Sequence, residues 1–109
     1  MRQAERRIWL CADDYGISPS VNAAIRDLVV RGHLNATSVM VVAPSLHRGE
    51  ALALQALNAK TQSVAIGLHV TLTAPFRPLS EGFRPLRDGV FLPLGTLLLR
   101  ASLRSLASK

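Results

Sequence analysis

The segment IWLCADDYGISPSVNAAI, residues 8–25, decides the fold of this 109-residue chain. Residues 8–12 form a short apolar run between a basic cluster and the letters DYG, which is typical of a strand buried on both faces in a parallel sheet. Ser18 is a good helix N-cap, and proline suits the first helical position, so a helix is predicted from Pro19 to Arg31. The segment therefore predicts the first strand and helix of an α/β fold.

The same alternation continues downstream. ATSVMVV, residues 36–42, is rich in β-branched residues and predicts a second buried strand. Residues 45–59 predict a second helix with Ser45 as its cap, and residues 63–72 predict a third strand. The order β-α-β-α-β implies parallel strands joined by right-handed crossovers.

Residues 74–95 break this pattern, since they hold four of the six prolines and three of the seven glycines. They predict a long loop, which in a compact domain is usually functional or disordered. Residues 96–109 are basic and amphipathic and predict the start of a helix. Three parallel strands leave a sheet edge without cover. We therefore expect residues 1–109 to be the N-terminal portion of a single longer domain.

Composition narrows the class of protein. The chain is 49% hydrophobic and 18% charged, which suits a packed core and not a disordered segment. No apolar stretch approaches the roughly 20 residues that span a bilayer, and the N-terminus lacks the apolar region of a signal peptide. We therefore expect a cytoplasmic protein. The single cysteine, Cys11, cannot form an internal disulfide, and its place in the first predicted strand favours a small core residue over a reactive thiol.

The formal net charge of +6 comes from 13 basic residues against seven acidic ones. The basic residues are scattered along the chain, and no aromatic residues interleave with them. This distribution favours a solvated surface over a nucleic-acid or phosphate patch, and no nucleic-acid partner is expected.

Polar residues follow two of the predicted strands. Asp13 and Asp14 stand at the end of the first strand, and His69 stands near the end of the third. Ligands of parallel α/β folds gather at the carboxyl ends of the strands. Consecutive strand residues point to opposite faces, so one aspartate could bind a metal while the other faces water or substrate. Aspartate oxygen with histidine nitrogen suits zinc or another borderline ion such as nickel, cobalt or manganese.

Structural interpretations stay open for each of these residues. An aspartate pair after a strand can provide one cap and one salt bridge, and a lone histidine in an apolar strand is more often a core or outer-shell residue. His33 and His47 are predicted on the surface. Only Asp14 and His69 can be counted as ligands, whereas a hydrolytic metal site needs about three protein ligands and a water.

Two phosphoryl-transfer folds also place acidic residues after the first strand. A receiver-like domain needs a phosphorylatable aspartate after the third strand, but no aspartate lies between Asp27 and Asp88. A haloacid-dehalogenase-type phosphatase needs Asp-x-Asp, which ADDYG lacks. The sequence disfavours both.

Three segments in order resemble the YdjC-like carbohydrate deacetylases, which include chitooligosaccharide and hopanoid-biosynthesis-associated deacetylases. ADDYGISPSVNAAI, ATSVMVVAPS and VAIGLHVTLTAPFRPL resemble the family signatures A-D-D-F/Y-G, T-S-x-M-V and G-L-H-x-T-L-T. The likeness extends from Ile8 to Gly95. It implies a barrel-like (β/α) fold, of which this chain is the truncated N-terminal part. It also implies metal-dependent removal of N-acetyl groups from an acetylated sugar or oligosaccharide.

The resemblance implies roles for individual residues. Asp14 and His69 correspond to metal ligands, and Asp13 corresponds to the general base. The implied ion is divalent, with zinc or magnesium favoured. A further histidine ligand and the general acid belong to a downstream region, because the family domain is more than twice as long as this chain. Arg77 and Arg84 are weaker candidates for contacts with sugar hydroxyl or phosphate groups.

A non-enzymatic alternative is a truncated α/β module for interaction or oligomerisation. Its surfaces would be the unfinished sheet edge and the apolar segment LPLGTLLLRASLRSL, residues 92–106. This alternative includes a homo-oligomer formed through the exposed sheet edge.

Overall fold

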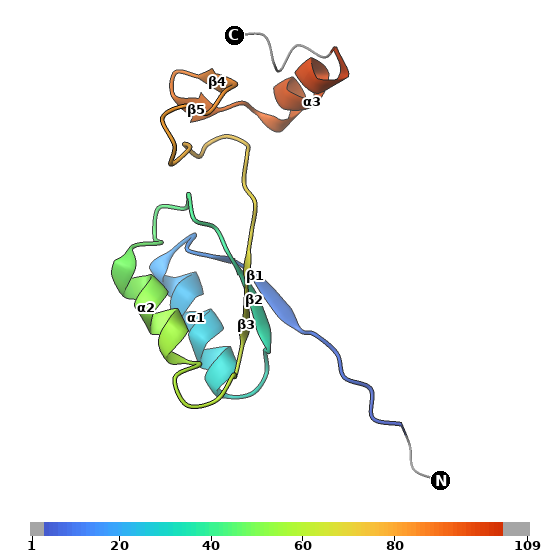
Figure 1. Cartoon of the computed structure of the whole chain (residues 1–109), viewed down its shortest axis with the longest axis vertical. Coiled ribbons are helices and arrows are strands. Elements are labelled where there is room, and N and C mark those ends of the chain that lie inside the picture. Colours follow the sequence, from blue (N-terminus) through green and yellow to red (C-terminus); the bar gives the residue numbers. More distant parts are fainter. Residues whose placement is uncertain (1–3, 104–109) are drawn as a thin grey trace. The chain divides into compact units, whose positions relative to one another are not determined.

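The computed structural model describes residues 4–103. The chain divides into two compact units, Met1–His69 and Val70–Lys109. The first unit alternates strands and helices, and the second contains a short hairpin and a helix (Figure 1).

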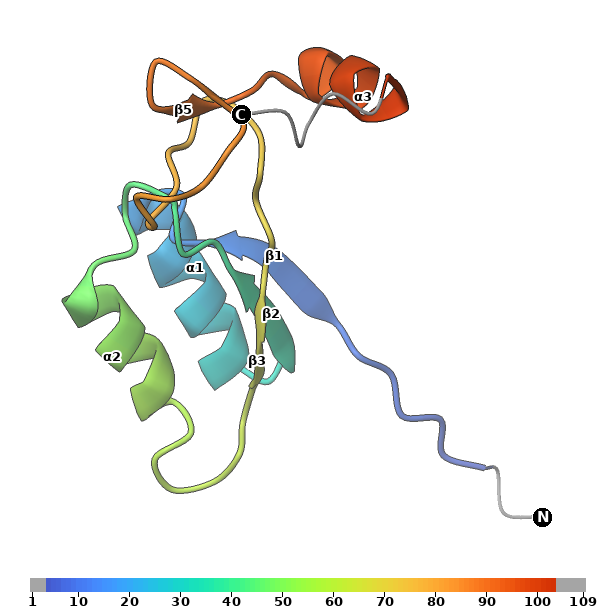
Figure 2. The same cartoon turned by 45° about the horizontal axis from the view of Figure 1, so that its top comes forward.

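The first unit contains a parallel sheet of three strands, β1 (Cys11–Tyr15), β2 (Ala36–Val39) and β3 (Ala65–Leu68), in the order β1-β2-β3. Helices α1 (Pro19–Val30) and α2 (Arg48–Ala56) connect the strands. Both helices lie on the same side of the sheet (Figures 1 and 2). The predicted α/β class and the β-α-β-α-β order are therefore confirmed.

The hydrophobic core lies between the sheet and the two helices. Tyr15, Ile25 and Leu54 form its buried cluster, with Val39 among the residues packed against it. Thr37 is also buried, and its hydroxyl donates to the carbonyl of Ala12 at 2.7 Å. Because side chains alternate along a strand, the residue between Thr37 and Val39 points to the face away from the helices.

The start of α1 follows the predicted signals. The Ser18 side chain accepts a hydrogen bond from the N–H of Val21 at 3.2 Å, and Pro19 occupies the first helical position. Arg31 is the C-cap and Gly32 follows it with a φ of 75°. The left-handed backbone that ends many helices suits glycine.

The first strand begins later than predicted. β1 covers Cys11–Tyr15, so the two aspartates lie inside it and not after it. β2 begins at Ala36, opposite Cys11, so residues 8–10 precede the paired part of the sheet, and Trp9 is 74% exposed. Cys11 is itself exposed, and its predicted role as a core residue is therefore wrong.

The second helix is shorter than predicted and has a different N-cap. α2 begins after His47, which makes no side-chain capping bond. Ser45, the predicted cap, instead donates its N–H to the carbonyl of Gly16 at 2.8 Å. β2 and β3 are likewise shorter than the predicted strands at residues 36–42 and 63–72. His33 and His47 are exposed, as predicted.

The second unit corrects the predicted loop at residues 74–95. Strands β4 (Leu86–Arg87) and β5 (Val90–Phe91) form an antiparallel hairpin. Asp88 and Gly89 connect them with φ values of 53° and 76°, and two-residue hairpin turns of this kind favour Asp-Gly. Helix α3 (Leu94–Ser102) confirms the first part of the predicted C-terminal helix, and residues 104–109 lie outside the described residues.

No helix within residues 4–103 has the length and apolar character needed to cross a membrane.

Candidate functional site

Four polar side chains meet at the carboxyl end of the parallel sheet, and we call them the rim cluster. Asp13 and Asp14 come from β1, and Ser38 comes from β2. His69 directly follows β3, where its N–H donates to the carbonyl of Val39 at 2.9 Å. The structure therefore brings together the three site residues that the sequence predicted in this unit.

The two aspartates of the rim cluster have different partners. Asp14 Oδ1 lies 3.1 Å from His69 Nδ1, and these side chains are 50% and 34% exposed. Ser38 Oγ donates to Asp13 Oδ1 at 2.7 Å and lies 3.1 Å from His69 Nδ1. Ser38 thus connects Asp13 on the first strand with His69 after the third.

An irregular backbone lets both adjacent aspartates reach the rim. The pairing of β1 with β2 shifts register between Ala12 and Tyr15, and Asp14 has a φ of 70°. A left-handed conformation costs a residue with a side chain about 1–2 kcal/mol. Positions of this kind collect at functional sites, where the surrounding structure holds them.

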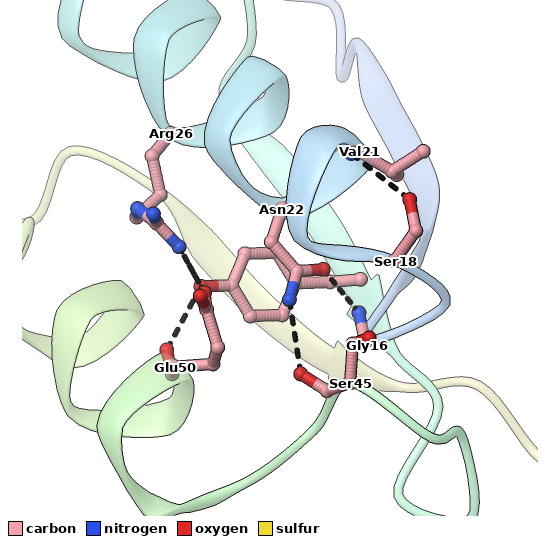
Figure 3. Close-up of polar contacts among 8 residues, drawn as sticks. Gly16, Ser18, Val21, Asn22, Arg26, Ser45 and Glu50 are labelled. Carbon is pink, nitrogen blue, oxygen red and sulfur yellow. Dashed lines mark hydrogen bonds and ion pairs between the residues drawn. The ribbon is translucent and has the colours of Figure 1, made fainter.

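Buried hydrogen bonds hold the chain just after Asp14 (Figure 3). The Asn22 side chain is completely buried, and its Oδ1 accepts from the N–H of Gly16 at 2.6 Å. Its Nδ2 donates to the carbonyl of Ser45 at 3.1 Å. Asn22 therefore ties the loop after β1 to the loop after β2.

A second network anchors the end of β1 to both helices. The Tyr15 hydroxyl donates to the carbonyl of Glu50 at 2.8 Å and accepts from Arg26 at 2.7 Å. Arg26 also forms an ion pair with the Glu50 carboxylate (Figure 3). The residue that follows Asp14 is consequently fixed by contacts from α1 and α2.

The rim contacts favour an ionised Asp13. The hydrogen bond from Ser38 is the largest influence and lowers the pKa of Asp13, whereas desolvation acts in the opposite direction. Desolvation and the neighbouring Asp13 charge raise the pKa of the Cys11 thiol. At neutral pH this corner of the sheet therefore presents a carboxylate beside a protonated thiol.

Asp14 and His69 provide the donor atoms that zinc and related ions bind. Two ligand atoms about 2.1 Å from one tetrahedral ion lie roughly 3.4 Å apart, close to the observed separation of 3.1 Å. An ion here would replace the hydrogen that Nδ1 presents to the carboxylate. Within residues 4–103, no group of three or more His, Cys, Asp or Glu residues could hold a metal. The pair therefore fits part of a metal site.

Arg77 and Arg84 belong to the second unit and are exposed there. Arg84 donates to the carbonyls of Phe83 at 2.7 Å and Glu81 at 3.4 Å. A substrate contact by either arginine stays a prediction.

Sequence reasoning missed Ser38 and Asn22. The alternation of ATSV could have placed Ser38 on the face opposite the buried Thr37. Asn22 shares the helical stripe of Ile25 and Val29, the other buried residues of α1. A polar residue in an apolar stripe indicates a buried side chain whose hydrogen bonds must be satisfied.

The fold and the geometry thus define the class of protein. It is an α/β protein with a cluster of carboxylate, hydroxyl and imidazole groups at the ends of its parallel strands. The family model described as YdjC-like protein matches residues 7–108, and the chain belongs to this family. It is also 38% identical over 85 residues to a carbohydrate deacetylase from Vibrio vulnificus (strain YJ016). The match covers 77% of this chain and 31% of that relative, so the chain spans about a third of its length. No solved structure matches the chain significantly.

Proposed function

We propose that the chain is the N-terminal portion of a metal-dependent carbohydrate deacetylase that removes N-acetyl groups from an acetylated sugar or oligosaccharide. The rim cluster is the observation that carries this proposal, because it places two carboxylates and an imidazole together at the strand ends. The family and the named Vibrio relative support the choice of reaction and substrate class.

We further propose that residues 1–109 belong to one barrel-like α/β domain. β1 and β3 are the two outer strands of the sheet. An apolar cavity of about 460 Å³ is lined by residues of β2, β3 and α2, including Leu54, Ile66 and Leu68. Ile66 and Leu68 are among the exposed hydrophobic residues. Apolar side chains on one face of a sheet normally pack against a further element, which supports additional strands and helices in the complete domain.

In this proposal Asp14 and His69 hold a divalent ion, either zinc or magnesium. When bound, such an ion polarises a carbonyl oxygen and lowers the pKa of a coordinated water. The positive φ of Asp14 keeps its carboxylate beside His69 Nδ1. The Asn22 and Tyr15 hydrogen bonds hold that backbone in place.

Asp13 is the proposed general base. Its carboxylate is exposed and ionised at neutral pH, so it can take a proton from the attacking water. The water oxygen bonds to the acetyl carbon, the carbon–nitrogen bond breaks, and acetate leaves the sugar amine. The proton that the amine gains comes from a group outside this chain's rim cluster.

Zinc titration of the 109-residue chain tests the ligand assignment. His69→Ala and Asp14→Asn should each weaken zinc binding by about tenfold or more, since the first removes a ligand atom and the second removes the negative charge of a ligand. His33→Ala is the matched control, because His33 is an exposed histidine. Equal dissociation constants for the wild type and the His69 variant would refute the assignment.

A chimera tests the catalytic role, since this chain matches only part of the relative. The matched segment replaces its counterpart in the Vibrio carbohydrate deacetylase, and acetate release from an N-acetylated carbohydrate that this relative accepts is measured. Asp13→Asn should lower kcat by roughly 10²–10⁴-fold, as expected for loss of a general base. Full activity of this variant would rule out the base role.

A second candidate function is an interaction module that self-associates through its sheet. The outer position of β3 and the exposure of Ile66 and Leu68 favour it, because uncovered strand edges pair with other chains.

A further inference from the structure

Within the rim cluster, Ser38 lies between Asp13 and His69. It comes from β2, the middle strand of the sheet, and β3 places Gly67 opposite it in the parallel register. Glycine has no side chain, so the β3 position opposite Ser38 adds none beside the hydroxyl. The hydroxyl reaches Asp13 on one side and His69 on the other.

The number of hydrogens on Ser38, Asp13 and His69 determines which group donates in each hydrogen bond. A serine hydroxyl has one hydrogen, and an ionised carboxylate only accepts. The 2.7 Å contact therefore uses the Ser38 hydrogen, and Ser38 can only accept from His69 Nδ1, whose single hydrogen is shared with the Asp14 carboxylate at the same distance of 3.1 Å. A hydrogen bond to a carboxylate is charge-assisted and stronger than a neutral one. Asp13 is consequently held on the β2 side of the rim, while Asp14 is held at the imidazole.

Resting on the proposed function, we propose that Ser38 is a positioning residue that separates the roles of the two aspartates. It keeps Asp13 in place as the base and away from the ion that Asp14 and His69 hold. Without the hydroxyl, the exposed carboxylate of Asp13 can rotate to the same ion.

This role predicts an opposite effect on binding and on catalysis. Cation affinity rises with the number of charged ligands in a site, so a second carboxylate at the ion strengthens binding. The same movement removes the base from the water. If Ser38 had only a structural role, its removal would instead weaken both zinc binding and catalysis.

The test is a zinc titration of the full 109-residue chain. Ser38→Ala should tighten zinc binding by on the order of tenfold, because a second carboxylate then reaches the ion, and Ser38→Thr should restore the wild-type value. Adding Asp13→Asn to Ser38→Ala should abolish the gain, which a double-mutant cycle isolates. Ser20→Ala, at an exposed serine of α1, is the matched control.

Unchanged or weaker zinc binding by Ser38→Ala would overturn the inference, as would a gain that persists without the Asp13 carboxylate. In the chimera, Ser38→Ala should lower kcat more than it changes KM.

The side-chain rotamer of Asp13, measured by NMR couplings in the metal-free chain, separates the two proposals. We expect one rotamer in the wild type and in Ser38→Thr, and averaging in Ser38→Ala. A wild type that binds no zinc would refute the metal ligands, whereas an unchanged rotamer in Ser38→Ala would refute the role of Ser38.

Discussion

Asn22 shows how a single side chain can position a site that it does not contact. It is completely buried and joins Gly16, two residues after Asp14, to Ser45 in the next loop. A buried polar group that loses its partner retains its full desolvation penalty. The side chain therefore stabilises the backbone that presents the Asp14 carboxylate.

Asn22→Ala should lower the free energy of unfolding by about 1–3 kcal/mol for each backbone group left without its partner. Asn35→Ala is the matched control. Asn35 also binds one N–H and one carbonyl, those of Leu10 and Ile8, but the residue is only half-buried and both hydrogen bonds are exposed to solvent. Urea unfolding of both variants is the measurement. A loss for Asn35→Ala as large as that for Asn22→Ala would contradict the importance of burial.

Alanine substitutions at Gly16 and Gly32 distinguish the stability cost of backbone strain from that of a steric clash. Both have positive φ, 111° and 75°, so alanine at either position is strained by about 1–2 kcal/mol. An added Cβ at Gly16 would lie 3.1 Å from the carbonyl oxygen of Met40, whereas at Gly32 it meets nothing within 4 Å. Gly16→Ala should therefore cost about 1–3 kcal/mol more than Gly32→Ala in thermal unfolding. Equal losses would show that the loop after β1 relaxes to admit the methyl group.

At the scale of the elements, the ion pair of Arg26 and Glu50 joins α1 to α2 beside Tyr15. Desolvation raises the pKa of Glu50, but the hydrogen bonds from Arg26 and Tyr15 and the charge of Arg26 lower it. The net pKa of Glu50 lies below its ordinary value of 4.5. A carboxyl group with a lowered pKa in the folded state stabilises that state above its unfolded pKa.

This linkage predicts an acid-dependent loss of stability. The contribution of Glu50 should be present above about pH 4.5 and disappear as the pH falls through the lowered pKa. Glu50→Gln removes the titrating group, so its stability difference from the wild type should shrink below pH 4.5. Urea unfolding at a series of pH values measures this difference. A constant difference across that range would contradict the linkage.

Local signals predicted the start of α1 better than they predicted the start of α2 or the bounds of the strands. Ser18 and Pro19 define the start of α1 through contacts within a few residues, which a sequence displays directly. The start of β1 depends on pairing with Ala36, 25 positions away from Cys11. The apolar residues before Cys11 carry no information on that pairing register. The start of the first strand was therefore predicted too early.

Three of the four residues of the rim cluster were predictable from the sequence, but Ser38 and the contacts between the residues were not. Parallel strand order brings Asp13, Asp14 and His69 to one rim, so their proximity follows from the fold class. The bridging hydroxyl of Ser38 depends on the register of β2 against both neighbours. The positive φ of Asp14 depends on the bulge in β1. Neither feature has a signal in the local sequence.

At the scale of the whole molecule, the first unit leaves apolar groups of its sheet uncovered. Leu68 is 64% exposed and lines the apolar cavity next to α2. If these surfaces mediate self-association, sedimentation should show oligomers whose fraction rises with protein concentration.

Leu68→Lys should shift this equilibrium toward the monomer, because a charge in an apolar contact is costly to desolvate. Leu52→Lys is the matched control, since Leu52 is also exposed but does not line the cavity. A monomer at all concentrations, or equal effects of the two variants, would refute the interaction module.

The exposure of Cys11 has a practical consequence. It is the single cysteine of the sequence, and its Sγ lies 3.7 Å from Asp13 Oδ1. A fluorine label attached to this thiol would therefore sit at one defined position beside the rim cluster, without any substitution in the protein. The raised pKa of the thiol calls for labelling in mildly alkaline buffer, where more of the reactive thiolate is present. The natural sequence thus contains its own attachment point for a spectroscopic reporter of events at the strand ends.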